Sequence, residues 1–227
     1  MVKTPSCNTC IFKSEATKFL SDDEIVQLEK NCATAEFNKG ETIFKQGTFS
    51  KNVVYLKDGI VKLLLEGPRK NQITAIKKGP DYLGIPTAFD EKHYRYSAVS
   101  ISKISACFID IELFKQFVIK NGLFAFRIII NLCKDNLDVF EKCVNKSQKN
   151  ARGRIAEALL FFKEEIYNSE SFILPLTRKE LGNYTDTARE CVSRILSEFD
   201  KDRIIKVAGR KIKIINSGAL ELIKKTG

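Results

Sequence analysis

The sequence lacks the residue sets that catalysis normally requires. It contains a single histidine, His93, and no combination of serine, histidine and aspartate that resembles a hydrolytic triad. It has no glycine-rich loop of the kind that holds phosphates, and no helix that carries paired carboxylates for acid–base chemistry. We therefore expect that the protein is not an enzyme.

Long apolar runs are also missing. No run approaches the ~20 residues that a membrane-spanning helix needs, and the N-terminus has no basic segment followed by an apolar one, as a secretory signal would. We expect a cytoplasmic protein that makes no membrane contact. The 227 residues, 44% of them apolar and 29% charged, have the composition of an ordinary globular chain with room for two modest domains.

Positive charge is what the sequence has in excess, with a formal net charge of +10. From Asn145 onward, 17 basic and 11 acidic side chains leave a net +6, so most of the excess lies in little more than a third of the chain. A basic surface by itself is weak evidence for a nucleic-acid partner. It gains weight here because it surrounds a helix-turn-helix pattern.

The helix-turn-helix pattern is the stretch LTRKELGNYTDTARECVSRILSEF, residues 176–199. Thr177 and Glu180 form a capping box at the start of the first helix, and Asp186 falls at the turn, where aspartate tolerates the left-handed conformation. The second helix is expected to begin at about Thr187. The helical period places four polar residues on one face, namely Arg189, Glu190, Ser193 and Arg194, and four apolar residues on the other, namely Val192, Ile195, Leu196 and Phe199.

The polar face has the chemistry of a DNA-reading helix. An arginine can pair with the O6 and N7 atoms of guanine, a glutamate can accept from the amino group of cytosine, and a serine can bond to bases or phosphate. Charged residues at this spacing also occur on helix faces that simply meet water. The segment that follows favours the DNA-reading interpretation.

That segment, residues 202–216, predicts a basic β-hairpin around a turn at Ala208-Gly209-Arg210. In its second strand, Ile212 and Ile214 alternate with Lys211 and Lys213, which gives one apolar and one basic face. A basic hairpin after a helix-turn-helix is typical of a wing. The candidates for phosphate contacts, which position the module without reading sequence, are Thr177, Arg178, Lys206, Arg210 and Lys211.

The sequence pattern before the winged helix changes once, from strand-like to helical. Glycines at positions 40, 47, 59, 67, 79 and 84 separate short apolar runs, which predicts an antiparallel β-roll. A helical pattern then takes over after Asp110. We expect an N-terminal cysteine-containing arm (residues 1–20), a β-roll sensor domain (21–111), a dimerisation helix (112–148) and a winged helix-turn-helix domain (149–227).

The helical pattern contains an apolar seam with alternating steps of four and three residues. A seam of this length can pack against the chain's own domains, but it more often forms a two-helix interface. We therefore expect a homodimer. The seam residues are Ile119, Leu123, Phe126, Ile130, Cys133, Leu137, Phe140 and Val144.

Seven cysteines remain to be explained. A disulfide framework is not expected in a reducing cytosol, so metal binding, redox chemistry or simple burial stay open. Cys7 and Cys10 have the C-x2-C spacing. Cys133 and Cys191 read as packing residues, and Cys143 lies beside the seam.

In the order of these parts the sequence resembles the CRP/FNR superfamily of bacterial transcription regulators. The resemblance covers nearly the whole chain, through FNKGETIFKQG, YLKDGIVKL and GPDYLG in the β-roll and TRKELGNY and ARECVSRILSEFDKDRIIKVAGRKIKI in the winged helix. It implies an α+β fold with a cyclic-nucleotide-binding-like jelly roll, a long dimerisation helix and a winged helix-turn-helix. It also implies double-stranded DNA, a second copy of the chain and RNA polymerase as partners.

The recognition helix combines features of two branches of that superfamily. The E-x-x-S-R pattern of Glu190, Ser193 and Arg194 is similar to the FNR branch, which reads TTGAT-type half-sites. Arg189 is more similar to the cAMP-receptor branch, which reads TGTGA. Ala188 departs from both, because each usually has a serine or threonine there.

The resemblance also bears on the signal. In the cAMP branch a glutamate holds the ribose, and Ile85 stands in its place here, so we expect no cAMP binding even if Arg95 occupies the phosphate position. The FNR branch holds a four-iron four-sulfur cluster on an N-terminal cysteine trio and one cysteine of the β-roll. Cys7, Cys10 and Cys107 match, the position near Ala16 has no cysteine, and Cys32 is the candidate substitute.

Two alternatives stay open at this stage. The cysteines can instead bind zinc or serve as small buried hydrophobic residues. The winged helix can belong to a ligand- or redox-sensing module that contacts a protein partner rather than DNA. His93, as the only histidine, is expected on a surface loop.

Overall fold

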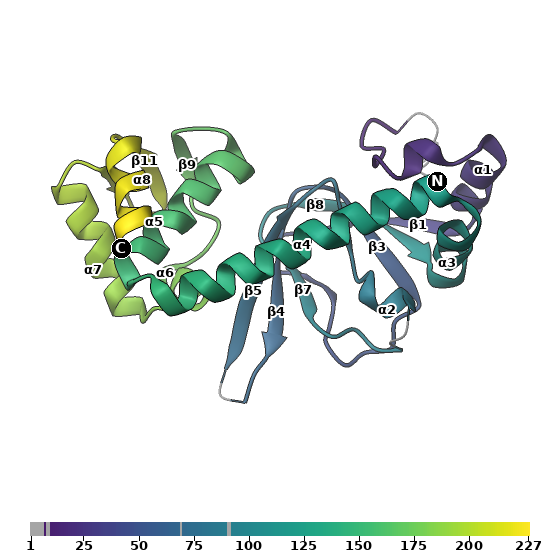
Figure 1. The fold of residues 1–227 in the computed structure, drawn as a ribbon, viewed down its shortest axis with the longest axis horizontal. Coiled ribbons are helices and arrows are strands. Elements are labelled where there is room, and N and C mark those ends of the chain that lie inside the picture. Colours follow the sequence, from purple (N-terminus) through teal and green to yellow (C-terminus); the bar gives the residue numbers. More distant parts are fainter. Residues whose placement is uncertain (1–6, 8–9, 69, 90–91) are drawn as a thin grey trace. The chain divides into compact units, whose positions relative to one another are not determined.

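The computed structural model describes residue 7 and residues 10–68, 70–89 and 92–227. Part of the expected N-terminal arm, residues 1–6 and 8–9, lies outside these ranges. The chain forms two compact units, Met1–Asn136 and Leu137–Gly227 (Figure 1). Within the described ranges, no single helix is both long and apolar enough to cross a membrane; the one pair that meets the criteria jointly is bent by 110°.

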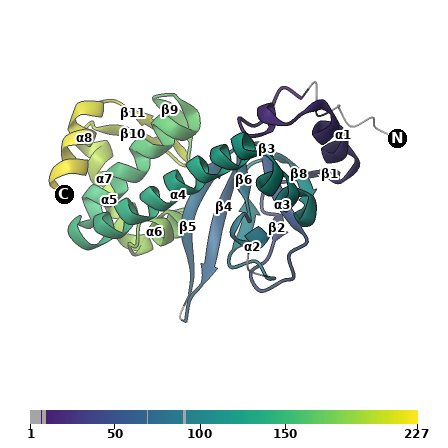
Figure 2. The same ribbon diagram turned by 45° about the vertical axis from the view of Figure 1, so that its right-hand side comes forward.

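The first unit contains two four-stranded antiparallel sheets that form a jelly roll (Figure 2). One sheet has the order β1 (Cys32–Phe37), β8 (Ile104–Asp110), β3 (Asn52–Asp58) and β6 (Asp81–Leu83). The other has the order β2 (Thr42–Phe44), β7 (Ser97–Ser100), β4 (Ile60–Glu66) and β5 (Asn71–Lys78). This confirms the β-roll predicted from the glycine-separated runs.

Apolar side chains of both sheets meet in one core, which includes Val54, Leu56, Val61 and Leu63. The turns between strands depend on glycine where the backbone is left-handed and crowded. Gly59 has a φ of 91°, and a Cβ atom there would lie 2.4 Å from the carbonyl oxygen of Lys103. Only glycine fits this turn between β3 and β4.

Helices cover the outer face of the first sheet. They are η2 (Thr17–Phe19), α1 (Asp22–Lys30), α2 (Pro86–Phe89), α3 (Ile111–Lys120) and the first part of α4 (Gly122–Gln148). Ser21 and Glu24 form a complete capping box at the start of α1. A second core joins these helices to the sheet through rings such as Tyr82, Phe114 and Phe124.

The expectation of one helix from residue 112 to 148 is wrong, because the helix is broken at Asn121. That residue is extended, with φ −115° and ψ 98°, and α3 and α4 meet at 110°. Its carboxamide oxygen accepts from the Phe124 amide at 3.1 Å, while its amide nitrogen donates to the Phe19 carbonyl at 2.9 Å. An Asn-Gly pair offers the backbone this alternative to continuous helix. Ile119 therefore lies on α3 and does not belong to the seam of α4.

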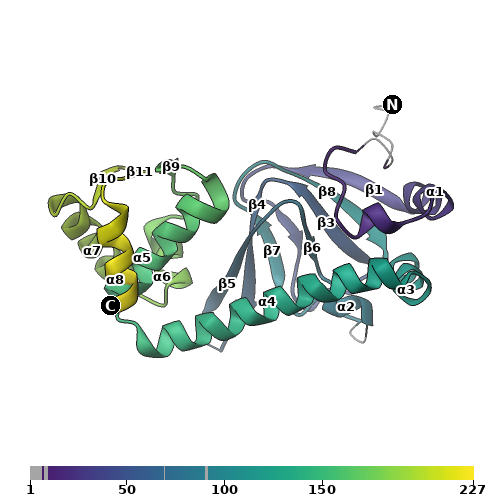
Figure 3. The same ribbon diagram turned by 45° about the horizontal axis from the view of Figure 1, so that its top comes forward.

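The remaining seam runs along α4, and much of it is exposed in the single chain. The first part of α4 runs alongside the sheets of the first unit (Figure 3). Phe124 and Ile128 on this part of the helix are buried in the core of that unit. By contrast, Leu123, Phe126, Leu137, Phe140 and Val144 are each at least 50% exposed. Cys133 is exposed and Ile130 is half-buried. Packing within the chain thus accounts for one face of α4 and leaves the seam accessible to a second helix.

The second unit is a winged helix. Its elements after α4 are α5 (Ala151–Phe161), η3 (Phe162–Tyr167), β9 (Ser171–Ile173), α6 (Arg178–Tyr184), α7 (Arg189–Lys201), β10 (Ile205–Ala208), β11 (Lys211–Ile214) and α8 (Ser217–Thr226). The wing is the predicted hairpin β10–β11, and β9 joins it in the order β10-β11-β9. Neither β9 nor α8 was predicted from the sequence.

Candidate nucleic-acid interface

The first helix of the helix-turn-helix, α6, starts as the sequence predicts. The Thr177 hydroxyl accepts from the Glu180 amide at 3.2 Å, and the Glu180 carboxylate accepts from the Thr177 amide at 2.8 Å. Asp186 has a φ of 51° in the turn to α7. The capping box and the left-handed aspartate are both confirmed.

The turn also depends on an arginine that the sequence analysis missed. Arg154 on α5 donates through Nε to the carbonyl of Thr185 at 2.7 Å and through Nη2 to the carbonyl of Asp186 at 3.2 Å. It donates through Nη1 to the carbonyl of Lys149 as well. These carbonyls follow helix ends, where backbone acceptors lack intrahelical partners. Arg154 is separated by about 30 residues from the turn it holds, which is why local patterns did not reveal it.

Gly182 brings α6 and the turn into close contact. The amide of Thr187 donates to the carbonyl of Gly182 at 2.7 Å. A Cβ atom at position 182 would lie 2.4 Å from the Thr187 carbonyl oxygen and 3.4 Å from Cγ2 of Val192. The close approach of α6 and the turn is therefore possible only because residue 182 has no side chain.

The second helix, α7, starts at Arg189, two residues later than predicted. Ala188 is the N-cap residue, and its backbone is extended. The predicted division of its faces is confirmed. The four apolar residues Val192, Ile195, Leu196 and Phe199 are at most 1% exposed. The four predicted base-reading residues, Arg189, Glu190, Ser193 and Arg194, are all exposed.

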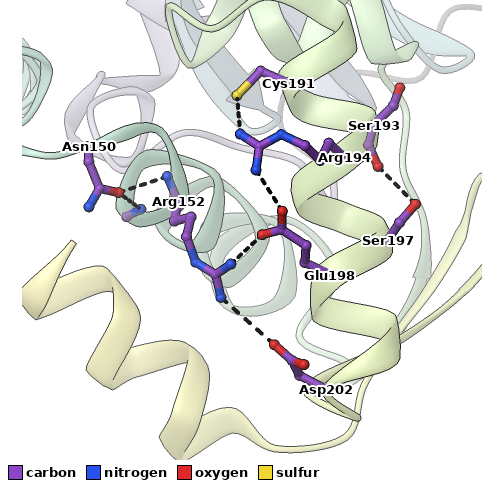
Figure 4. Close-up of polar contacts among 9 residues, drawn as sticks. Asn150, Arg152, Cys191, Ser193, Arg194, Ser197, Glu198 and Asp202 are labelled. Carbon is purple, nitrogen blue, oxygen red and sulfur yellow. Dashed lines mark hydrogen bonds and ion pairs between the residues drawn. The ribbon is translucent and has the colours of Figure 1, made fainter.

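Two of these polar side chains have partners within α7, and Figure 4 shows those of Arg194. The Ser193 hydroxyl donates to the carbonyl of Arg189 at 3.1 Å, so its oxygen lone pairs are what it offers outward. Arg194 donates to the Glu198 carboxylate at 2.6 Å and to the sulfur of Cys191 at 3.5 Å. The hydrogen bond that Arg194 donates to Glu198 raises the pKa of Arg194 above its ordinary value, so the guanidinium stays charged.

The wing presents a basic face beside α7. Lys206, Lys211 and Lys213 are exposed, while Ile212 and Ile214 are buried, as the alternation predicted. Lys206 lies 3.6 Å from the Asp200 carboxylate. These lysines remain available to phosphate because such exposed ion pairs are weak.

The other predicted phosphate contacts bond to the main chain in the single chain. Arg210 donates to the carbonyls of Leu174 at 3.2 Å and Pro175 at 2.6 Å, and Arg178 donates to the carbonyl of Gly209 at 3.0 Å. Burial lowers the pKa of Arg178. The two arginines thus tie the wing turn to the segment that leads into α6. Their contact with phosphate stays a prediction, as does that of Thr177.

The cysteines predicted to act together lie in the first unit. Cys7, Cys32 and Cys107 pack against the same apolar core, and β1 and β8 pair so that Cys107 lies opposite Thr34, whose hydroxyl is 3.6 Å from its sulfur. Cys10 follows in a turn, with its amide 3.5 Å from the Cys7 carbonyl. Among the described side chains no group of three is arranged to hold a metal ion.

Cys7, Cys32 and Cys107 influence one another's pKa values. Burial raises the pKa of Cys7 to about 11, and nearby Cys107 adds to the shift. A hydrogen bond between Cys32 and Cys107 lowers the pKa of Cys107 and raises that of Cys32. The thiols therefore lie close enough to interact, even though they do not form a ready ligand set.

Ile85, which stands where the cAMP branch has its ribose-binding glutamate, has apolar surroundings. Ile85 is 4% exposed and packs in the same core as Tyr82 and Phe114. Arg95 and His93 are exposed, and His93 lies edge-on to Phe49. The surface position predicted for His93 is confirmed.

A β-roll, a long helix with an exposed apolar seam and a winged helix with a polar recognition face together define a DNA-binding transcription regulator. Residues 153–223 match the model of the Crp-like helix-turn-helix domain, and residues 34–121 match that of the cyclic nucleotide-binding domain. The chain belongs to the CRP/FNR family of transcription regulators. Proteins of this family bind DNA as dimers.

Several known regulators are similar to most of the chain at low sequence identity. The chain is 26% identical over 222 residues to the fumarate and nitrate reduction regulatory protein of Vibrio cholerae, covering 94% of this chain and 88% of the relative. It is 25% identical over 184 residues to the transcriptional activator FnrA of Stutzerimonas stutzeri, covering 79% and 75%. The structure of FixK2 from Bradyrhizobium japonicum has the same fold, with a TM-score of 0.78 at 20% identity over 86% of this chain and 98% of that one.

Proposed function

We propose that a homodimer of this chain reads an inverted-repeat operator with two copies of α7. The half-sites are of the TTGAT or TGTGA type and lie about 34 Å apart, one helical turn of DNA. Arg189, Glu190, Ser193 and Arg194 contact base edges. The wing contacts phosphate, and RNA polymerase is the protein partner at the promoter.

The observation that carries this proposal is the exposed polar face of α7. All four predicted base-reading residues are exposed on a helix whose opposite face is buried. Lys211 and Lys213 on strand β11 are exposed and add positive charge, while the residues between and after them, Ile212 and Ile214, are buried in the core. Sequence-specific DNA-binding proteins combine these two features, because base contacts determine sequence specificity and phosphate contacts fix the position of the protein on the duplex.

The test is a titration of labelled duplexes followed by fluorescence anisotropy. Three duplexes of equal length carry a TTGAT inverted repeat, a TGTGA inverted repeat or a scrambled sequence, each at several salt concentrations. We expect preference for one repeat by a factor of about 10³ or more over the scrambled duplex, with affinity that falls as salt rises. Equal, weak binding to all three would favour the alternative in which the winged helix contacts a protein.

We further propose that the cysteine group of the first unit senses the signal by holding an iron–sulfur cluster. The supporting observation is that Cys7, Cys32 and Cys107 converge on one core, with Cys10 beside Cys7. Four thiolates are the usual ligand set of such a cluster. Bound there, the cluster would supply sensitivity to oxygen, and the four cysteines would hold it.

Metal analysis of anaerobically purified protein tests the sensor proposal. We expect iron and acid-labile sulfide in the wild-type chain, and their loss in Cys32→Ser. Cys143→Ser, at an exposed cysteine of α4, is the matched control and should retain both. A wild-type protein without iron would overturn the cluster proposal. Full iron content in Cys32→Ser would remove Cys32 from the proposed ligand set.

A further inference from the structure

Glu198 lies at the centre of a chain of ion pairs behind the base-reading face of α7. One carboxylate oxygen accepts from Nη1 of Arg194 at 2.6 Å, and the other accepts from Nη1 of Arg152. Nη2 of Arg152 lies 3.9 Å from the Asp202 carboxylate. Figure 4 shows the series running from α5 through Glu198 to Arg194. The four side chains thus form one continuous network.

The α5 end of this network is fixed. The guanidinium of Arg152 lies over the ring of Phe199, 5.1 Å from its centroid, and Phe199 is fully buried. The backbone of Arg152 is held as well, because the Asn150 side chain caps α5 and accepts from the Arg152 amide at 2.9 Å. Side-chain exposure rises from 32% at Glu198 to 64% at Arg194. Arg152 is itself 38% exposed, so the network links an anchor that lies on a buried ring to a side chain that faces outward.

The guanidinium of Arg194 is held by hydrogen bonds, but some of its N–H donors remain available. Its Nη1 donates to Glu198 and its Nη2 to the sulfur of Cys191 at 3.5 Å. Two of its five N–H donors are engaged, so the others remain for the O6 and N7 atoms of a guanine. A free arginine side chain loses rotamer entropy when it is immobilised. Immobilisation before binding reduces the part of that cost that falls on the complex.

The geometry points to Glu198 as a positioning residue that sets how strictly Arg194 discriminates its base, with Arg152 as its anchor. The inference rests on the proposed base-reading role of Arg194. Glu198 does not contact DNA in this account. It acts through the orientation of the Arg194 guanidinium, and the sequence pattern of the recognition helix gave it no role.

The carboxylate has a second effect that gives the role a distinctive signature. A negative charge near the DNA surface repels phosphates whatever their sequence. Replacing Glu198 with glutamine keeps the size of the side chain but removes both the repulsion and the strong pairing with Arg194. Binding to random DNA should therefore stay equal or tighten, while preference for the correct base falls. General damage to the helix would weaken both kinds of binding.

The experiment is a double-mutant cycle on the full-length protein with the preferred duplex and single-base-pair variants of it. Arg194→Ala first identifies the base pair whose discrimination depends on Arg194. At that base pair, Glu198→Gln should reduce discrimination by about two- to fivefold, the scale of a partly exposed ion pair. In the Arg194→Ala background, Glu198→Gln should change discrimination no further, because the two residues act as one unit.

Two companion variants separate positioning from folding. Arg152→Gln removes the anchor and should reduce discrimination at the same base pair. Glu221→Gln breaks a similar ion pair on α8, with Lys224, and should leave discrimination unchanged. Melting temperatures of all variants are compared with wild type to confirm that each is folded.

The possible outcomes distinguish failure of the base-reading role of Arg194 from failure of the positioning role of Glu198. If Arg194→Ala loses no discrimination at any base pair, the proposed role of Arg194 fails. If Arg194→Ala behaves as expected but Glu198→Gln retains full discrimination, or has the same effect with and without Arg194, the positioning role of Glu198 is overturned. If Glu198→Gln binds the specific and random duplexes more tightly by the same factor, Glu198 acts only as a repulsive charge, and its positioning role is overturned.

Discussion

We propose that the exposed polar side chains of the second unit have two roles, with some reading DNA bases and others contacting the DNA backbone. Arg194 offers N–H donors in a fixed orientation beside Glu198, whereas Lys211 is an exposed charge on the wing. Arginine paired to guanine carries sequence information, and lysine paired to phosphate does not. Substitution of the two should therefore give different patterns of loss.

Arg194→Ala should relax discrimination at one guanine by about 1–3 kcal/mol, whereas Lys211→Ala should weaken specific and random duplexes alike and lower the salt slope by about one. Equilibrium binding to matched duplexes at several salt concentrations measures both. If Arg194→Ala loses affinity equally on specific and random DNA, its base-reading role is wrong.

Gly182 predicts a second effect at the residue scale. Because an added Cβ would meet a backbone oxygen at 2.4 Å, Gly182→Ala should destabilise the winged helix by about 1–3 kcal/mol. Denaturant unfolding measures the change. Gly218→Ala is the control, since its Cβ would make only an ordinary 3.6 Å contact. Equal stability of the two variants would mean that α6 and the turn do not need their close approach.

At the scale of elements, the long helix shows what a sequence period can and cannot predict. The steps of four and three residues correctly predicted helical structure, but the same pattern continued through Asn121 and concealed the break. At the break the Asn121 side chain donates a hydrogen bond to the Phe19 carbonyl, about 100 residues away in sequence. A contact of that kind leaves no trace in a local apolar pattern.

The exposed seam of α4 predicts a dimer that a single charge should disrupt. Leu137 is 61% exposed in the single chain, so Leu137→Asp should leave the monomer folded. It should weaken dimerisation by at least tenfold, because burial of a leucine contributes about 2 kcal/mol. Light scattering resolves the dimer from the 25.7 kDa monomer.

Leu222 on α8 gives a matched control, as it is also 61% exposed. Leu222→Asp should leave the oligomeric state unchanged. A wild-type protein that stays monomeric at micromolar concentration, or a Leu137→Asp variant that dimerises as well as wild type, would contradict the interpretation of the seam.

At the scale of the whole molecule, the parts with short-range signals were predictable. Glycine spacing gave the β-roll, capping boxes gave the starts of α1 and α6, and alternation gave the wing. The missing parts depend on distant contacts. Strand β9 is only three residues long and pairs with β11 about 40 residues later, and Arg154 serves a turn outside its own helix.

The site was predictable to a similar extent. The exposed face of α7 followed from the helical period, since Arg189, Glu190, Ser193 and Arg194 lie on one side of a regular helix. The ion pairs of Glu198 did not, because one partner comes from α5. The convergence of Cys7 with Cys32 and Cys107 also required the folded chain, as strand pairing brings β1 beside β8.

The central claim, a two-fold reader of an inverted repeat, is tested most directly by the spacing of the half-sites. Binding is measured on duplexes in which the two half-sites are separated by the proposed one helical turn, about 10–10.5 base pairs between centres, and on duplexes with five base pairs added. We predict that two chains bind the first duplex cooperatively and that the added half turn abolishes this. Equal affinity at both spacings, or binding of one chain to one half-site, would contradict the account.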